Sequence, residues 1–136
     1  MSGAATSGPS TSRGAFLILL VAAGGFLGAT LRLGVAELVG IAGLPFWQAT
    51  FTVNAVGCFL MGILLARVSA THQPYWRAFL GFGLLGAFTT FSTFSADVID
   101  LVRSSILGGA AYLLGTVATC LAGVLLGEYI GRRRPR

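Results

Sequence analysis

The chain has 136 residues, of which 55% are Ala, Val, Ile, Leu, Met, Phe, Trp, Tyr or Cys and only 10% are charged. An ordinary soluble domain carries about 25% charged residues, and a soluble chain of this length leaves roughly a third of its surface in water. So much apolar surface cannot be hidden, and the surplus must face lipid. The composition all but excludes a soluble enzyme, a disordered chain and a DNA-binding domain.

Four apolar stretches follow a small, polar segment over residues 1–14, which is predicted to be a disordered tail. Each stretch exceeds the ~20 residues that a helix needs to cross the membrane, and none alternates as a barrel strand does. A signal peptide is the alternative for the first stretch, but its apolar pattern is too long. We therefore predict an all-α, multi-pass plasma-membrane protein with one transmembrane domain over residues 15–131. The four stretches are Ala15–Val39, Phe46–Val68, Trp76–Val102 and Ile106–Ile130.

The net charge of +5 comes from nine arginines against four acids, and it indicates membrane orientation. An even number of crossings puts both termini on one side, and the positive-inside rule then favours cytoplasmic termini. Residues 132–136 are predicted to be a basic cytoplasmic tail that anchors to anionic lipid headgroups, with no nucleic-acid partner. Arg103, with Arg32 as a second candidate, is on the opposite side. The termini side carries Arg13, Arg67, Arg77, Arg132, Arg133, Arg134 and Arg136.

The chain offers no catalytic constellation, so we predict that it is not an enzyme. Cys58 and Cys120 lie inside apolar stretches without a C-x-x-C pair, which is typical of small buried hydrophobes. His72 is alone in a polar loop and has no metal-ligand spacing. No nucleophile–base pair and no carboxylate pair occurs along the sequence.

Arg32 is the first polar group inside a membrane stretch, and Gly24 and Gly28 precede it at four-residue spacing. The two glycines are typical of close helix packing. Two interpretations of Arg32 remain open: its side chain reaches the membrane interface, or it places positive potential in a water-filled mouth. Glu37, near the end of the same stretch, is a candidate to neutralise it in part.

Asn54 lies about a third of the way into the second stretch, with Thr50 one turn earlier on the same face. A carboxamide in lipid must form hydrogen bonds. Its partner is either a neighbouring helix or a permeating ion, because the amide supplies donors without a fixed charge.

The third stretch contains two glycines and then five hydroxyl residues within seven positions, from Gly83 to Ser95. Ser and Thr compete for backbone hydrogen bonds, which weakens a helix, so a break near the bilayer midplane is predicted. Such a break is tolerated only beside protein or water and frees carbonyls that can hold a cation. Phe91 and Phe94 are three residues apart, and their electropositive ring edges with the neighbouring hydroxyls form a plausible anion path.

The fourth stretch carries two ladders at four-residue spacing. Tyr112, Thr116 and Cys120 form a polar stripe that is a candidate to face a pore. The other ladder is small throughout, which predicts close helix packing. It consists of Gly115, Thr119, Gly123, Gly127 and Gly131.

Three motifs in the first three stretches together resemble the small fluoride channels of the Fluc (CrcB) family. The resemblance covers nearly the whole chain after residue 14. The motifs are Gly24-Gly25-x-x-Gly28-Ala29-x-x-Arg32, Thr52-x-Asn54-x-x-Gly57-Cys58-Phe59-Leu60-x-Gly62 and Gly83-x-x-Gly86-x-x-Thr89-Thr90-Phe91-Ser92-Thr93-Phe94.

The resemblance implies an antiparallel dual-topology dimer with two fluoride pores and passive export of cytoplasmic fluoride. It places fluoride-contacting ring edges at Phe91 and Phe94. It makes Asn54 the pore asparagine and Arg32 the arginine of the first helix. The remaining pore candidates are Thr50, Ser92, Thr93, Tyr112 and Thr116.

The resemblance also implies a structural Na⁺ at the dimer interface, held by main-chain carbonyls at positions that look like Gly86 and Thr89. Members of the family usually have serine on the fourth-helix polar track, where this chain has Tyr112, Thr116 and Cys120. A dual-topology homodimer needs nearly balanced basic residues, whereas this chain has a cytoplasmic excess. The partner is therefore a second copy or an oppositely oriented paralogue.

Two alternatives from other classes stay open. A small four-helix proton-coupled or multidrug transporter needs a titratable carboxylate at membrane depth. Glu37 and Glu128 lie near stretch ends, and Asp97 and Asp100 lie in the last part of the third stretch. A structural membrane subunit, in which the polar run only packs, is the other alternative.

Overall fold

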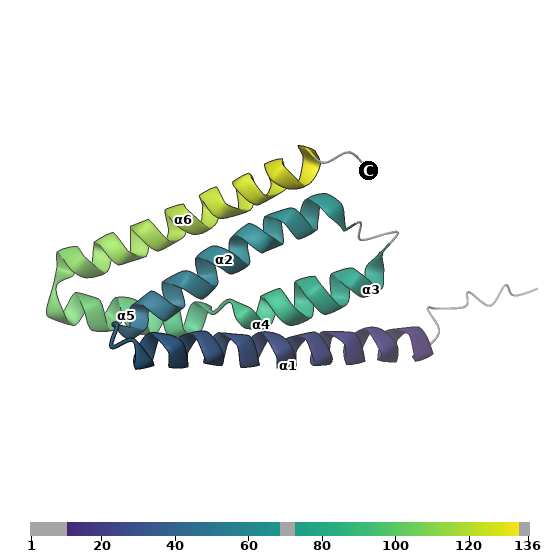
Figure 1. Ribbon diagram of the computed structural model, residues 1–136, viewed down its shortest axis with the longest axis horizontal. Helices are drawn as coiled ribbons and strands as arrows, with labels where there is room; N and C mark the ends of the chain where they lie inside the picture. The colour runs from purple at the N-terminus through teal and green to yellow at the C-terminus, as the bar shows by residue number, and fades with distance from the viewer. Residues whose placement is uncertain (1–10, 69–72, 134–136) are drawn as a thin grey trace, which may run out of the picture.

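The computed structural model describes residues 11–68 and 73–133, and four helical spans in this part are long and apolar enough to cross a membrane. They run up and down as a bundle (Figure 1). The predicted all-α fold with four transmembrane helices is confirmed, and the chain is a multi-pass membrane protein. The spans are α1 (Thr11–Ile41), α2 (Phe46–Arg67), a composite third span (Pro74–Ser104) and α6 (Ile106–Arg133).

The third span is interrupted where the sequence predicts a break. Between its helices α4 and α5, Thr89 and Thr90 have extended backbone, with ψ angles of 156° and 125°. The hydroxyl-rich run gives these residues side-chain alternatives to helical hydrogen bonds, which is the physical reason for the break. The span consists of α3 (Pro74–Trp76), the π-helix η1 (Arg77–Leu85), α4 (Gly86–Phe88) and α5 (Phe91–Ser104).

Both described ends of the chain lie at one end of the bundle, as an even number of crossings requires (Figure 1). The rings of Phe16, early in α1, and Tyr75, at the start of the third span, are 5.4 Å apart between centroids. Arg77 donates from Nη1 to the carbonyl of Val68, just after α2, at 3.1 Å. These contacts join the starts of spans one and three to the end of span two.

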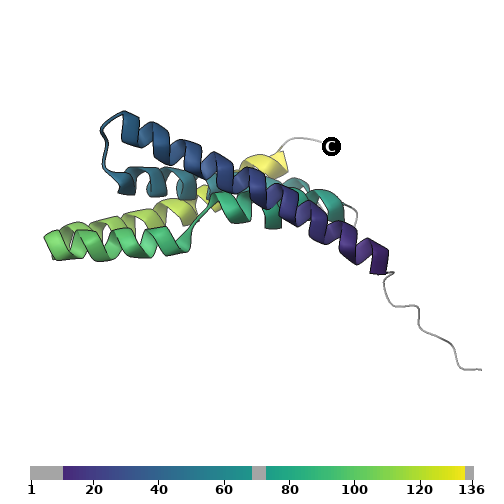
Figure 2. The same ribbon diagram turned by 90° about the horizontal axis from the view of Figure 1, so that it is seen from below.

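Glycines seat α1 against the first half of the third span. A Cβ on Gly24 would meet the Phe79 carbonyl, and one on Gly28 would meet the Leu84 carbonyl. Gly83 approaches α1 in the same way, because its Cβ would lie 2.9 Å from the Cα of Gly24. The predicted packing role of Gly24 and Gly28 is confirmed. Figure 2 shows α1 crossing obliquely over this part of the bundle.

The small ladder of α6 packs on α2, although not along its whole length. Cβ atoms on Gly127 and Gly131 would collide with the Phe59 carbonyl and the Ala66 side chain, and Gly123 also faces α2. Gly115 has open space beside it, and Thr119 is exposed. The packing prediction therefore holds for the C-terminal half of the ladder, where α2 and α6 lie side by side, and it fails for the N-terminal half.

The helix ends differ from the predicted bounds at both termini. Helix α1 begins at Thr11, four residues before the expected start, and α6 continues to Arg133. No proline stands between Pro9 and Pro45, so nothing in the sequence stops the first helix from starting early. Residues 1–10 and 134–136 of the two predicted tails lie outside the described residues.

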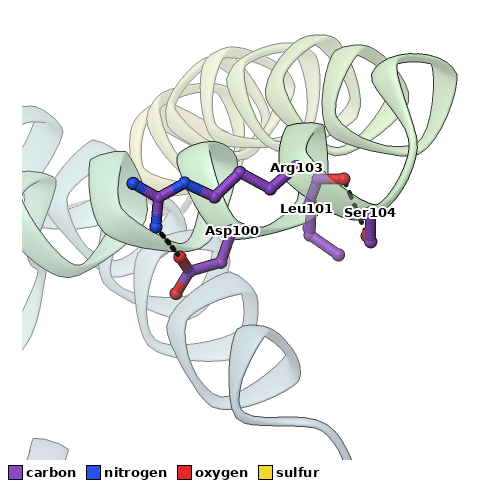
Figure 3. A network of polar contacts seen from close by, with 4 residues as sticks. All are labelled: Asp100, Leu101, Arg103 and Ser104. Atoms are coloured by element: carbon purple, nitrogen blue, oxygen red, sulfur yellow. Dashed lines mark hydrogen bonds and ion pairs between the residues drawn. The ribbon is translucent and has the colours of Figure 1, made fainter.

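The end of α5 is fixed by local polar contacts (Figure 3). Arg103 pairs with Asp100 at 3.4 Å, and both side chains are largely exposed. Ser104 donates from Oγ to the Leu101 carbonyl at 2.8 Å, and Ser105 alone connects α5 to α6. An exposed pair of this kind contributes little to stability. Its effect is local, at the turn into the fourth span.

Candidate functional site

The side chain of Asn54 holds the break in the third span. Its Nδ2 donates to the Thr90 carbonyl at 3.0 Å, and its Oδ1 accepts from the Thr90 amide at 2.8 Å. The carboxamide therefore gives the Thr90 amide a partner in place of the Gly86 carbonyl. It also adds a second donor to the Thr90 carbonyl, which as the N-cap carbonyl accepts the first hydrogen bond of α5, and Asn54 itself is 8% exposed. The prediction that Asn54 must find a partner is confirmed, and the protein partner is backbone rather than a side chain.

Thr90 also starts the helix that follows the break. Its Oγ1 accepts from the Thr93 amide at 3.2 Å, which is an N-cap for α5. The same oxygen donates to Thr93 Oγ1 at 3.1 Å and lies 3.3 Å from Ser92 Oγ. Three hydroxyl groups thus converge at the start of α5, where the amides of a helix N-terminus favour negative charge.

The break leaves the carbonyls from Gly86 to Thr89 without their helical partners. In a continuous helix the amides of Thr90 and Thr93 would donate to the carbonyls of Gly86 and Thr89. Here they donate to Asn54 Oδ1 and to Thr90 Oγ1 instead. Gly86 and Thr89 are the positions expected to hold a cation, and the hydrogen bonding of the break fits that expectation.

A cavity of about 270 Å³, the Asn54 cavity, lies between α2, the break and α6. Of the predicted pore residues, it takes Asn54, Phe91, Phe94 and Thr116 from three separate spans. Its wall is completed by Cys58, Thr89, Thr90, Val117 and Cys120.

Four aromatic rings run in series from this cavity. Phe91 and Phe94 lie 5.9 Å apart between centroids, and Phe94 lies 5.6 Å from Tyr112. Tyr112 is in turn 5.6 Å from Trp47, in an edge-on arrangement. Phe91 is 80% exposed in the single chain, whereas Phe94 is 6% exposed. The two phenyl groups therefore contact one another, but only Phe94 is enclosed by this chain.

A second cavity of about 350 Å³, the Arg32 cavity, separates α1 from α2. Arg32, Thr50, Thr90 and Thr93 supply its polar wall. Arg32 Nε is buried without a hydrogen-bond partner among the described residues, and Glu37 does not pair with it in this part of the chain. The interpretation in which Arg32 lines a hollow is therefore favoured over extension to the interface.

A third cavity, of about 200 Å³, lies beside Tyr112 and shares Thr116 with the Asn54 cavity. Thr116 is 3% exposed, and its Oγ1 has no partner in the described residues. Tyr112 donates to Asp97 Oδ2 and to the Trp47 carbonyl, both at 3.4 Å. The stripe predicted on α6 is thus one face that lines two hollows in succession.

The structure does not gather all the predicted pore residues in one place. Arg32, Thr50 and Thr93 line the Arg32 cavity, and Thr90 belongs to both that cavity and the Asn54 cavity. Ser92 is exposed, and its hydroxyl contacts Thr90 Oγ1. The predicted pore residues other than Ser92 therefore line three cavities. The Arg32 and Asn54 cavities share Thr90, and the Asn54 cavity shares Thr116 with the cavity beside Tyr112.

Sequence reasoning missed three residues at this site. Thr90 is central through its backbone, for which a hydroxyl-rich run gives only a general indication. Trp47 lies at the start of the second stretch, where a tryptophan is typical of the membrane interface, and its contact with the Tyr112 ring comes from the packing of α2 on α6. Asp97 was weighed only as a transporter carboxylate, and its contact with Tyr112 depends on how α5 packs against α6.

The polar groups of the Asn54 cavity are uncharged donors: an amide, hydroxyls, thiols and the edges of phenyl rings. Small donors of this kind can replace the water around an anion without binding it too tightly to leave. Within the described residues no group of three or more His, Cys, Asp or Glu could hold a metal ion. A hard cation would therefore rely on carbonyl oxygens.

Comparisons with known proteins agree with this architecture. The family described as "CrcB-like protein, Camphor Resistance (CrcB)" matches residues 19–128. A "Fluoride-specific ion channel FluC 2" from Nocardia farcinica is 42% identical over 120 residues, which cover 85% of each chain. A "Fluoride-specific ion channel FluC" from Phenylobacterium zucineum is 43% identical over 123 residues, covering 85% of this chain and 95% of that protein. This chain therefore belongs to the CrcB family.

Proposed function

We propose that the chain forms a fluoride-selective ion channel that lets cytoplasmic fluoride leave the cell passively and so gives fluoride resistance. The observation that carries the proposal is the Asn54 clamp on Thr90, which places an amide, hydroxyl groups and two phenyl rings around one cavity at a break in a transmembrane span. The curated relatives are named fluoride-specific ion channels. A channel has no catalytic step, in keeping with the expectation that the chain is not an enzyme.

The predicted pore residues take different roles in this channel. Ring edges of Phe91 and Phe94 face fluoride, while Asn54 positions the break and presents its amide. Thr116 Oγ1, which is buried without a protein partner in the described residues, supplies a free donor on α6. The hydroxyls of Thr50 and Thr93 and the charge of Arg32 line the mouth that leads to this point. Tyr112 is held by Asp97 at the far end.

The dimer is part of the proposal. Phe91 is 80% exposed although it lines the Asn54 cavity, and Gly86 is exposed at the break. A second chain covering this face would enclose both. The antiparallel partner is either a second copy or an oppositely oriented paralogue, because the arginine excess at one end of the bundle favours a fixed orientation.

The structural Na⁺ expected at the dimer interface fits the same break. The carbonyls of Gly86 and Thr89 would hold it, since the amides of Thr90 and Thr93 bond elsewhere. Bound there, the ion supplies a fixed positive charge that joins the two chains and balances the carbonyl dipoles. The role of this chain is to keep the two oxygens unpaired and facing the partner.

Fluoride efflux from liposomes that hold the purified chain tests the function, with a fluoride electrode as the detector. We expect efflux well above that of empty vesicles, and chloride in place of fluoride should leave the vesicles at the empty-vesicle rate. Efflux equal to that of empty vesicles, both for the chain alone and for the chain reconstituted with an oppositely oriented paralogue, would contradict the proposal. Accessibility of terminal tags from both sides of the membrane would establish a dual-topology homodimer.

A further inference from the structure

Two free thiols line the Asn54 cavity, one from each of two packed helices. Cys58 on α2 and Cys120 on α6 both line it, and both are half-buried. Each thiol is next to a close contact between the two helices, because a Cβ on Gly123 would lie 3.4 Å from the Phe59 amide nitrogen. The backbones of α2 and α6 are held close on the C-terminal side of this pair, where a Cβ on Gly62 would meet the Val124 carbonyl. The spacing between the thiols is therefore set by tightly packed helices.

The cavity also contains a buried hydroxyl, that of Thr116, which is close to Tyr112 but forms no well-aligned hydrogen bond within the described residues. Thr116, one turn before Cys120, is 3% exposed, and its Oγ1 has no hydrogen-bond partner in the described residues. A buried hydroxyl without a protein partner needs water or another ligand. The space in front of the thiols is therefore suited to small solutes that arrive through water.

We propose that Cys58 and Cys120 form a two-coordinate site for a soft, thiol-seeking metal ion, Hg²⁺ or Ag⁺, and that its occupation blocks the Asn54 cavity. Soft cations prefer thiolate ligands, and these ions readily accept two of them in a line. With HgCl₂, each thiol loses its proton and each chloride leaves, so two thiols and one HgCl₂ give one S–Hg–S bridge, two H⁺ and two Cl⁻. No electrons are transferred.

Neutral HgCl₂ carries no charge that would keep it out of a site adapted to anions. The bridge would place a heavy atom beside Asn54, Phe94 and Thr116, which line the same cavity. Conduction needs this space free, so the bridge should stop it. The blocking effect rests on the proposed channel function, whereas the metal site itself does not.

Protection of the thiols from alkylation tests the site without reference to transport. The purified chain is titrated with HgCl₂, treated with a maleimide and weighed by mass spectrometry. One Hg²⁺ per chain should protect both thiols, and this protection should resist glutathione. C58S and C120S should each lose protection at about tenfold less glutathione, since one thiol cannot form the bridge. Equal resistance in the single variants, or a need for two Hg²⁺ per chain, would overturn the proposal.

Fluoride efflux then tests the block, with each variant compared with its own rate before metal is added. HgCl₂ should lower efflux about tenfold, and dithiothreitol should restore it. Methylmercury chloride, which can bind only one thiol, should act more weakly, and C58S/C120S should be insensitive. Unchanged efflux in a chain whose thiols are fully protected would overturn the block. Absence of efflux before metal is added, both for the chain alone and with the oppositely oriented paralogue, would instead contradict the proposed function, and the alkylation result would still decide the site.

Discussion

The two halves of the third span are held by different kinds of contact. The first half, residues 74–88, lies against α1 with glycines between the backbones, at Gly24, Gly28 and Gly83. The second half, α5, meets its neighbours mainly through side chains: Phe94 contacts Tyr112, and Asp97 accepts a hydrogen bond from it. Among the described residues, its one close backbone contact at a glycine is that of Gly109 on Val102, near the turn into α6. The break falls where one kind of contact gives way to the other.

This difference explains how a break in a membrane span is tolerated. Backbone contact at small residues fixes one half rigidly, because neither carbonyls nor Cα atoms can move aside. Asn54 then pairs with the Thr90 amide that the break frees and adds a donor to the Thr90 carbonyl. Because the first half is held against α1, the second half, α5, can present the polar and aromatic side chains of the site.

The largest effect is expected for Gly28→Leu, which disrupts the contact between α1 and the first half of the third span. The added side chain would start against the Leu84 carbonyl, so α1 and the first half of the third span must separate. We expect a loss of about 3 kcal/mol or more, seen as aggregation in size-exclusion chromatography or a large drop in thermal stability. Gly25→Leu is the matched control, because its Cβ meets nothing within 4 Å. Equal behaviour of the two variants would show that the glycine contact is not the anchor.

Asn54→Val addresses the point where the two halves meet. It removes both hydrogen bonds to Thr90 and leaves that amide unpaired, which costs about 1 to 3 kcal/mol, while the Thr90 carbonyl keeps its bond within α5. We expect fluoride efflux to fall about thirtyfold or more and thermal stability to fall with it. Thr52→Val is the control, since Thr52 is exposed and its hydroxyl bonds only within α2. Normal efflux in Asn54→Val would remove the clamp from the mechanism.

Substitution of Phe91 and Phe94 in α5 separates the effect of the rings on fluoride efflux from their effect on stability. Phe94→Ile and Phe91→Ile should each lower fluoride efflux about tenfold, because an aliphatic side chain lacks the electropositive ring edge. Phe94→Ile should also lower stability by about 1 to 2 kcal/mol, since Phe94 is buried in the chain and Phe91 is not. Phe82→Ile, on η1 and outside the Asn54 cavity, is the control. Unchanged efflux in both test variants would remove the role of the rings.

The smallest expected effect is that of Thr116→Val. The change removes a buried hydroxyl that has no partner in the described residues, so stability should stay the same or rise by about 1 kcal/mol. Efflux should fall about fivefold, as expected for one lost donor to a passing anion. Thr119→Val, one turn on and exposed, should change neither quantity. Reduced stability with normal efflux would make Thr116 a packing residue.

Local composition predicted the elements of this protein well. Hydropathy and length gave the four spans, and the run of glycines and hydroxyl residues after Gly83 gave the break, because helix weakening is a property of neighbouring residues. Gly24 and Gly28 were recognised as packing residues from their four-residue spacing, which is also a local property of the sequence. The predicted extent of the small ladder on the fourth span was wrong. A Cβ on Gly115 would meet nothing within 4 Å among the described residues, because a repeat of small residues does not show where the partner helix ends.

The membrane class, the number of crossings, the position of the break and the residue types near it follow from the amino-acid sequence, because each depends on short-range composition and on the thickness of the bilayer. Which of those residues are in contact depends on the tertiary structure. Asn54 lies 36 residues before the Thr90 backbone that it holds, and Cys58 and Cys120 come from different spans to line one cavity. Such pairings depend on the register of packed helices, which is fixed by close contacts far along the chain at Gly28 and Gly127.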